Sequence, residues 1–155
     1  MTTDSPKADT YILFELAGTT YGVKSSDVQQ LEMIEHITPV PNAGDTVEGV
    51  VFSRGKVIPA INLRVRFGFE KIPYDVRTRL VVVGIKDRTI GLIVDSAREF
   101  KNIPEESIVP PPDGLAPTNG HYLDAIATVD ENTILLLDLE ELVSDNVAET
   151  SLERG

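Results

Sequence analysis

Few side chains in this sequence could carry out chemistry, and their types already exclude several kinds of site. The chain has no cysteine, which excludes disulfides, thiolate zinc sites and cysteine nucleophiles. Its two histidines, His36 and His121, stand far apart in the sequence. Histidine metal sites need further ligands that converge on the same ion. We interpret both histidines as surface loop residues, and the sequence predicts no metal site.

Asp95 is the carboxylate with the most specific surroundings. It lies in Ile93-Val-Asp-Ser-Ala97, where an apolar strand delivers an aspartate followed by a serine. Aspartic proteases use such strands to bring together two carboxylates that share one proton. Ala97 stands where the turn of that motif needs glycine. We therefore favour an exposed aspartate at a strand end, and a homodimeric aspartic-protease-like enzyme using Asp95 is the enzymatic alternative.

The other candidate motifs are incomplete. The acidic pairs Glu105-Glu106 and Glu140-Glu141 are sequence neighbours, whereas general acid–base catalysis needs two carboxyls that converge from different environments. The glycine-bounded stretch 44–49 lacks the lysine and hydroxyl residue of a phosphate-binding loop. No serine stands in a Gly-x-Ser-x-Gly elbow. The sequence thus predicts a protein that is not an enzyme, with no catalytic and no cofactor-binding residue.

Two arginines, Arg54 and Arg64, flank an apolar stretch in the middle of the chain. Arg54 is followed by glycine and falls at an expected turn. A guanidinium at such a place is either solvated or fixes a protein interface, since arginine is enriched at binding hot spots. Composition alone leaves both interpretations open.

The elements that must position these side chains are expected to be strands. Short runs of Val, Ile, Leu and Thr alternate with Gly, Asp and Asn, a pattern typical of β-hairpins. Hairpins are expected over residues 11–23, 50–61, 80–94 and 126–137, and short helical turns over residues 26–31, 104–107 and 139–143. Glycines within or just before strands (Gly49, Gly84, Gly91) favour sharply bent strands. The pattern predicts an all-β protein built as small curled barrels.

Length and charge limit the range of partners. A chain of 155 residues favours one domain, and its net charge of -11 argues against binding to nucleic acid or anionic lipid. The polar N-terminus is unlike a signal peptide, and no apolar run approaches the ~20 residues of a membrane helix. We expect a cytoplasmic protein with no direct membrane insertion. Residues 1–9 are expected to be a disordered lead, and residues 144–155 a flexible acidic tail.

Four stretches of the chain resemble the CheW family of bacterial coupling proteins, in the expected order and spacing. Residues 49–64, Gly-Val-Val-Phe-Ser-Arg-Gly-Lys-Val-Ile-Pro-Ala-Ile-Asn-Leu-Arg, are similar to the family pattern Gly-Val-x-Asn-Leu-Arg-Gly-x-Val-x-Pro-Val-Ile-Asp-Leu-Arg. The other matching stretches are 14–23, 28–32 and 90–95. Together they carry the resemblance over about residues 11–143.

This resemblance implies a fold and a function. The fold would be two small five-stranded SH3-like barrels, interleaved along residues 11–143, with short helices. The function would be that of a non-catalytic adaptor between the cytoplasmic tip of a chemoreceptor and the regulatory domain of a CheA-type histidine kinase, in chemotaxis or a parallel motility system. Such an adaptor would associate with membrane receptor arrays through its partners. A regulatory fragment of a histidine kinase is the second alternative.

The resemblance also implies a set of interface residues. The receptor-facing surface would include Val28, Leu31, Arg54 and Val57, although Val28, Leu31 and Val57 could equally be core residues. Exposed apolar strand edges beside them would contact the kinase.

Two glycines, Gly49 and Gly55, would shape the hairpin that carries the matching motif. The chain departs from the family at a few positions near it, so that its partner set is expected to differ from that of the main flagellar pathway. Phe52 and Ser53 replace Asn-Leu, and Asn62 replaces the common Asp. Gln30 stands where an acidic residue is frequent, so position 30 cannot form an ion pair with Arg54. Glu32, which would face the same side of an extended strand, could form that ion pair instead.

Overall fold

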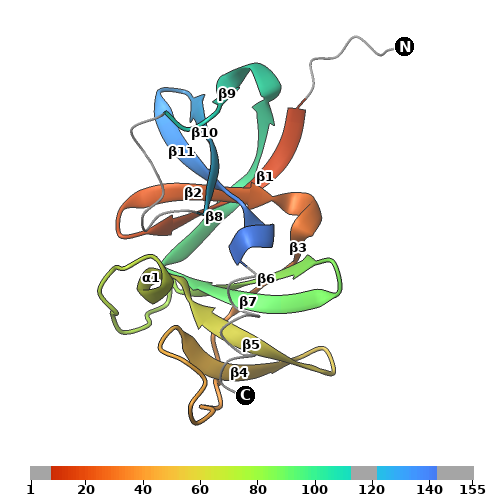
Figure 1. Cartoon of the computed structure of the whole chain (residues 1–155), viewed down its shortest axis with the longest axis vertical. Helices are drawn as coiled ribbons and strands as arrows, with labels where there is room; N and C mark the ends of the chain where they lie inside the picture. The colour runs from red at the N-terminus through yellow and green to blue at the C-terminus, as the bar shows by residue number, and fades with distance from the viewer. Residues whose placement is uncertain (1–7, 113–121, 143–155) are drawn as a thin grey trace.

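The computed structural model describes residues 8–112 and 122–142, and within these ranges it contains eleven β-strands in two sheets (Figure 1). The strands are β1 (Ala8–Leu16), β2 (Thr19–Lys24), β3 (Val28–Met33), β4 (Val47–Ser53), β5 (Lys56–Asn62), β6 (Arg79–Ile85), β7 (Arg88–Val94), β8 (Ser96–Pro104), β9 (Ile108–Val109), β10 (Leu123–Val129) and β11 (Asn132–Leu137). The first strand begins at Ala8, so two residues of the expected lead belong to the sheet. The rest of that lead and the expected tail lie outside the described residues.

The two sheets interleave along the chain, as expected. The upper sheet in Figure 1 has the strand order β8-β1-β2-β11-β10-β9, and the lower sheet has the order β3-β6-β7-β5-β4. The chain therefore starts in the upper barrel, builds the whole lower barrel, and returns to complete the upper one. The predicted all-β fold of two small SH3-like barrels is confirmed. The two-residue strand β9 raises the upper sheet from the expected five strands to six.

Tight turns explain why the hairpin predictions are correct. Each predicted hairpin is closed by a two-residue loop whose first residue has a positive φ, between 51° and 58° at Ala17, Arg54, Lys86 and Asp130. Turns of this kind match the right-handed twist of the two strands that they join. The hydrophobic runs on either side can then pair in register without a longer loop.

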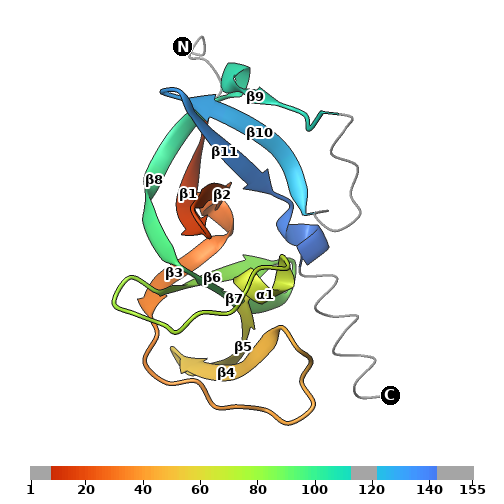
Figure 2. The same cartoon turned by 90° about the vertical axis from the view of Figure 1, so that its left-hand side faces the viewer.

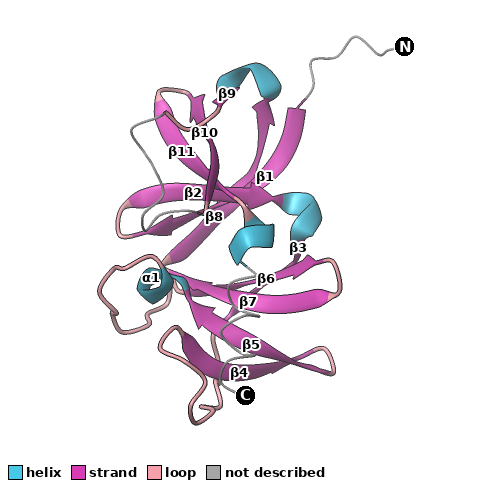
Figure 3. Ribbon diagram, in the orientation of Figure 1, coloured by secondary structure: helices cyan, strands magenta, loops and turns pink. Residues whose placement is uncertain are grey.

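One helical expectation was correct only for its first residues, and two were correct. Only Ser25–Asp27 form a 3-10 turn (η1), because Val28–Met33 instead form β3, which pairs with β6. Its side chains alternate between partly buried and exposed, as a half-buried strand requires. Glu105–Ser107 form a 3-10 turn (η2), and residues 139–142 are helical (Figure 3). The sequence did not predict β8 or the short helix α1 (Leu63–Arg66).

The hydrophobic core joins the two barrels into one body. The largest cluster of buried side chains draws on strands of both sheets, on α1 and on the helical residues 139–142, and it includes Phe14, Leu16, Ile61, Leu63, Leu92 and Leu142. Smaller clusters fill each barrel separately. The C-terminal helical turn lies at the junction of the barrels in both views (Figures 1 and 2). Because apolar burial at the junction is extensive, the barrels should move together.

Candidate partner interface

The β4–β5 hairpin carries the strongest sequence motif, and it ends in a strained turn. Arg54 and Gly55 form its tip, with φ angles of 51° and 80°. Gly55 adopts this conformation without cost, but a residue with a Cβ atom loses roughly 1–2 kcal/mol in the left-handed region. Arg54 is exposed, and the other three hairpin turns have the same positive φ at their first residue. The conformation therefore belongs to this kind of turn, and the exposed guanidinium is open to a partner.

An exposed apolar surface lies next to this tip. Phe52 and Val57 are cross-strand partners on β4 and β5, and their side chains are 75% and 63% exposed. Met33 on β3 is 60% exposed and lines, with Phe52, a cavity of about 460 Å³ between β3 and β4. Leu31 is exposed on the same outward side of β3. We call Leu31, Met33, Phe52 and Val57 the apolar face. Contiguous exposed side chains of this kind commonly mark protein interfaces.

Side chains bridge the two strands at the open seam of the lower barrel. Strands β3 and β4 are the two ends of the sheet order. Ser53 Oγ accepts a hydrogen bond from Gln30 Nε2 (2.6 Å) and donates one to Glu32 Oε2 (2.5 Å). Two of the departures from the family, Gln30 and Ser53, are therefore in direct contact. Glu32 bonds to Ser53, so the expectation that it would pair with Arg54 was wrong.

The predicted interface residues fall into two groups. Leu31, Arg54 and Val57 are exposed. Val28 is only partly buried but packs against the core between the barrels, which fits the alternative role of a core residue. The sequence reasoning missed Met33 as part of the exposed surface and treated Phe52 only as a departure. Alternation along β3 could have indicated Met33, because it shares the outward side of Leu31.

Gly49 allows a close backbone approach at the base of the hairpin. Its φ is 149°, and an added Cβ atom would overlap the carbonyl oxygen of Thr38. Thr38 and Val50 exchange two backbone hydrogen bonds of 2.9 Å at this point. Any other residue at position 49 would have to break this pairing, whereas Gly55 is required only for its backbone conformation.

Asp95 is mostly buried and is held by hydrogen bonds from two sides, so it is not the exposed aspartate that the sequence predicted. The guanidinium of Arg64 donates to both of its oxygens, with Nε–Oδ1 at 2.8 Å and Nη2–Oδ2 at 2.9 Å, and the backbone N–H of Ala17 donates to Oδ2 at 2.9 Å. Burial raises the pKa of Asp95, but the hydrogen bonds from Arg64 and Ala17 and the charges of Arg64 and Arg77 outweigh it, so that the net pKa is lowered. Such a carboxylate stays ionised and cannot share a proton as in a protease dyad.

Asp95 links the two barrels, which gives its partner Arg64 a structural role. Asp95 lies between β7 of the lower barrel and β8 of the upper one, and it binds both Arg64, which follows β5 of the lower barrel, and Ala17 in the β1–β2 turn of the upper one. The pair is mostly shielded, with side chains 15% and 20% exposed. We call Arg64, Asp95 and Ala17 the inter-barrel clamp. Sequence reasoning had noted Arg64 and Asp95 separately and did not connect them.

Asn62 has a local role that explains its departure from the family. It is 3% exposed, and its amide Nδ2 donates to Glu48 Oε2 at 2.9 Å. Its Oδ1 accepts from the backbone N–H of Val65 and caps α1. Lys71 Nζ lies 3.0 Å from the same Glu48 oxygen. Burial and the charge of Glu48 raise the pKa of nearby Tyr74 to about 12. An aspartate at position 62 would face Glu48, whereas an amide binds it.

Within residues 8–112 and 122–142, no group of histidine, aspartate and glutamate side chains could hold a metal ion. His36 contributes to the wall of the 460 Å³ cavity, and His121 lies outside the described residues. No helix of the described part is long and apolar enough to span a membrane.

Comparisons with known proteins agree with this geometry. The model of the CheW-like domain family matches residues 10–147. The chemotaxis protein CheW of Klebsiella aerogenes is 29% identical, covering 90% of this chain and 89% of its own, and the protein FrzA of Myxococcus xanthus is 27% identical, covering 86% and 84%. The crystal structure of the scaffolding protein TtCheW from Thermoanaerobacter tengcongensis superposes with a TM-score of 0.78 at 33% identity, covering 86% of this chain and 89% of the other. Scaffolding by that protein agrees with the prediction of a non-catalytic role. The chain belongs to the CheW-like domain family.

Proposed function

We propose that this protein is a non-catalytic adaptor that couples chemoreceptors to a CheA-type histidine kinase. The observation that carries the proposal is the apolar face beside Arg54, an exposed and uncharged surface on a protein of net charge -11. Family membership supports a role in chemotaxis, and the carboxylate with the strongest catalytic pattern, Asp95, is held in the inter-barrel clamp. A protein of this kind acts by positioning its partners rather than by chemistry.

Rigidity between the barrels supports the coupling role. The clamp and the large buried cluster at the junction hold both barrels in one relative orientation. An adaptor transmits the state of one partner to another only if its binding surfaces keep a fixed geometry. Residues 11–143 are then the functional unit, and a place at receptor arrays follows from the partners.

We assign the two contacts within the lower barrel as follows. Leu31, Arg54 and Val57 form the receptor-facing surface, with Val28 packed behind it. The open edges of β3 and β4, flanked by Met33 and Phe52, form the kinase contact, because unpaired strand edges invite docking. The departures at Phe52, Ser53 and Asn62 favour a partner set that differs from that of the main flagellar pathway.

A binding measurement with the full chain tests the proposal. The partners are the soluble cytoplasmic tip of a chemoreceptor and the regulatory domain of a CheA-type kinase from the same genome. We expect Phe52→Ser to weaken binding of the kinase regulatory domain about 10-fold or more, as truncation of an aromatic anchor buried at an interface does. Val76→Ser is the matched control, because Val76 is 81% exposed outside the apolar face. Failure of the unaltered protein to bind either partner would refute the proposal.

A further inference from the structure

Among the side chains that the structure describes, the unpaired positive charges gather at one end of this acidic protein. Most described lysine and arginine side chains make an ion pair or a hydrogen bond within the chain. Among the described side chains, the cations with no such partner are Arg54, Lys56 and Arg88. All three are exposed, and all three belong to the tips of two hairpins of the lower barrel.

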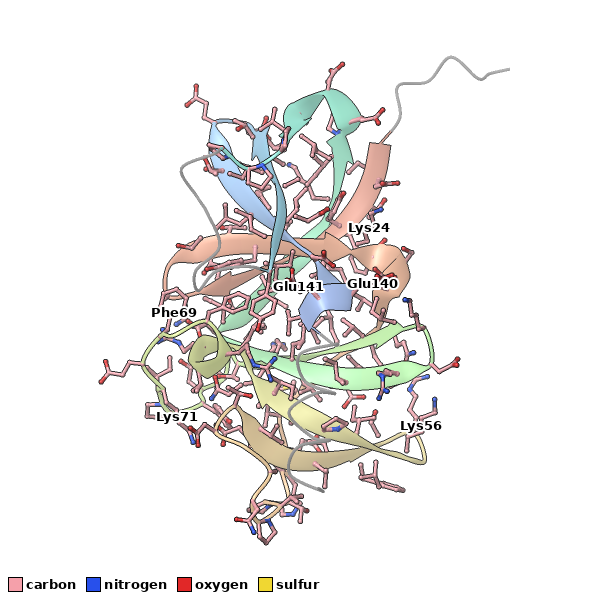
Figure 4. The ribbon with its side chains drawn as sticks, viewed as in Figure 1. Lys24, Lys56, Phe69, Lys71, Glu140 and Glu141 are labelled. Carbon is pink, nitrogen blue, oxygen red and sulfur yellow. The ribbon has the colours of Figure 1, made fainter. Side chains whose placement is uncertain are left out.

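These two hairpin tips lie at the same end of the sheet. Strands β5 and β7 are parallel neighbours, and Ala60 pairs with Gly91. Three residues earlier in each strand, the same register places Val57 level with Arg88. Gln29, Arg54, Lys56 and Thr89 line one cavity of about 180 Å³ between the tips. Both tips lie at the right of Figure 1, where Figure 4 labels Lys56.

The local charge is positive although the protein is acidic. The tips carry Arg54, Lys56, Lys86 and Arg88 against one acid, Asp87. Lys86 is directed to Glu140 at 3.9 Å, which leaves the other three cations available. We call Arg54, Lys56 and Arg88 the basic end. In a chain of net charge -11, such a patch resists burial against another positive surface and attracts carboxylates.

The departures from the family explain why Arg54 is available. Gln30 occupies the position where an acidic residue is frequent, and its amide donates to Ser53 instead. Glu32, the next acidic side chain on that side of β3, accepts from Ser53. Carboxylates that could have neutralised Arg54 within the chain are thus either absent or engaged. A guanidinium left in this state can bind a carboxylate of another protein in bidentate geometry.

We infer that the basic end binds carboxylate side chains on the receptor tip, because it continues the receptor-facing surface that contains Arg54 and Val57; the inference rests on the proposed function. The apolar pair Phe52 and Val57 borders the basic end, so the matching surface would combine acidic groups with an apolar patch. The overall negative charge disfavours a polyanion such as a nucleic acid or an anionic membrane, because only a small area of the protein would attract it.

Charge reversal with a matched control tests this inference on the full chain. One variant carries Arg54→Glu, Lys56→Glu and Arg88→Glu. The control carries Lys24→Glu, Arg77→Glu and Lys101→Glu, which changes the net charge equally at exposed or partly exposed ion-paired sites elsewhere. Association rates are measured with the receptor tip and with the kinase regulatory domain, at about 0.05 M and about 0.3 M salt. Circular dichroism melts confirm that each variant is folded.

We expect the first variant to associate about 10-fold or more slowly with the receptor tip at low salt, with a smaller difference at high salt. A loss confined to the kinase regulatory domain would overturn the inference. The control should differ little from the unaltered protein. Equal rates for the variant and the control, with the unaltered protein binding normally, would overturn the inference and leave the proposed function intact. Binding of the unaltered protein to neither partner would overturn both. Binding to phosphatidylserine vesicles that depends on the basic end, without a protein effect, would also overturn the inference.

Discussion

The Asn62→Asp substitution provides a quantitative test of the reasoning at the base of the hairpin. It restores the residue common in the family, and it keeps the side-chain cap on α1, since aspartate caps helices as well as asparagine does. It also replaces the N–H group that bonds Glu48 at 2.9 Å with a second carboxylate oxygen. A substitution toward the family pattern is therefore expected to destabilise this protein.

The magnitude follows from burial and charge. Losing a hydrogen bond to a charged group costs about 1.5–3 kcal/mol. Two carboxylates about 4 Å apart repel by up to about 4 kcal/mol at an effective dielectric constant of 20, and the nearby Lys71 reduces that figure. The introduced carboxyl can avoid the repulsion by binding a proton, which costs about 1.4 kcal/mol for each pH unit above its unfolded pKa near 3.9. At pH 7 the total penalty is therefore limited to about 4 kcal/mol. We expect a loss of about 2–4 kcal/mol.

The pH dependence distinguishes this mechanism from simple loss of packing. The introduced carboxyl would have a raised pKa in the folded protein, so its penalty is absent below about pH 4 and grows as the pH rises toward the folded pKa. Urea denaturation at pH 7.5 and at pH 4.5 measures the free energy of unfolding at each pH. Thermal melts should show a fall in Tm of about 5–15 °C at the higher pH.

Two further variants complete this test. Asn62→Ala should destabilise at both pH values alike, because it removes the cap and the bond to Glu48 without adding a charge. Adding Glu48→Gln to Asn62→Asp should recover most of the loss, because the new carboxylate then faces an amide. A deficit in Asn62→Asp that does not change with pH, or no deficit at all, would show that the contact with Glu48 is not the reason for the departure.

Three other predictions follow from the same structure. Arg54→Gly should raise stability by about 1 kcal/mol in thermal melts, since it relieves the left-handed backbone, and should lower partner affinity; a destabilised variant would contradict the strain argument. Asp95→Asn should cost about 1–3 kcal/mol at pH 7 after allowance for partial exposure. Because the folded pKa of Asp95 is lowered, its contribution is present above the unfolded pKa and lost as the pH falls through the folded pKa, so acid titration of stability should show the two proteins converging. Gly49→Ala should cost about 2 kcal/mol or more through its overlap with the Thr38 carbonyl, and an unchanged denaturation midpoint would show that the Thr38–Val50 pairing yields easily.

Local signals account for what the sequence predicted well. The turn at Arg54-Gly55 and the apolar runs on both sides of it define the β4–β5 hairpin without any knowledge of the rest of the fold. The same holds for the hairpin that closes at Asp130, where turn residues separate two aliphatic strands. Strand β8 escaped prediction because its sequence, Ser96–Pro104, mixes charged and apolar residues, and its long pairing with β1 supplies the order that its composition does not.

Tertiary register accounts for what could not be predicted. The sequence after Ser25 is compatible with both a helix and a strand. It forms a strand because β6 offers an edge with which residues 28–33 pair. Arg64 and Asp95 meet only because β5 and β7 run parallel, with Asn62 level with Ile93. No pattern within either segment indicates the other, so the sequence presented one as an interface candidate and the other as a catalytic candidate.

The departures from the family also show how a fold can be kept while its surface chemistry changes. Gln30 and Ser53 differ from the family at two positions that touch, and their hydrogen bond holds β3 and β4 together where an ion pair from position 30 to Arg54 is not available. The seam is thus held without the guanidinium of Arg54, which leaves its charge available for the contact that we infer. Asn62 likewise binds Glu48 and caps α1 with the same side chain. Because these contacts are made between neighbouring side chains of the lower barrel, we expect paired substitutions at Gln30 and Ser53 to change the surface that a partner meets more than the clamp between the barrels.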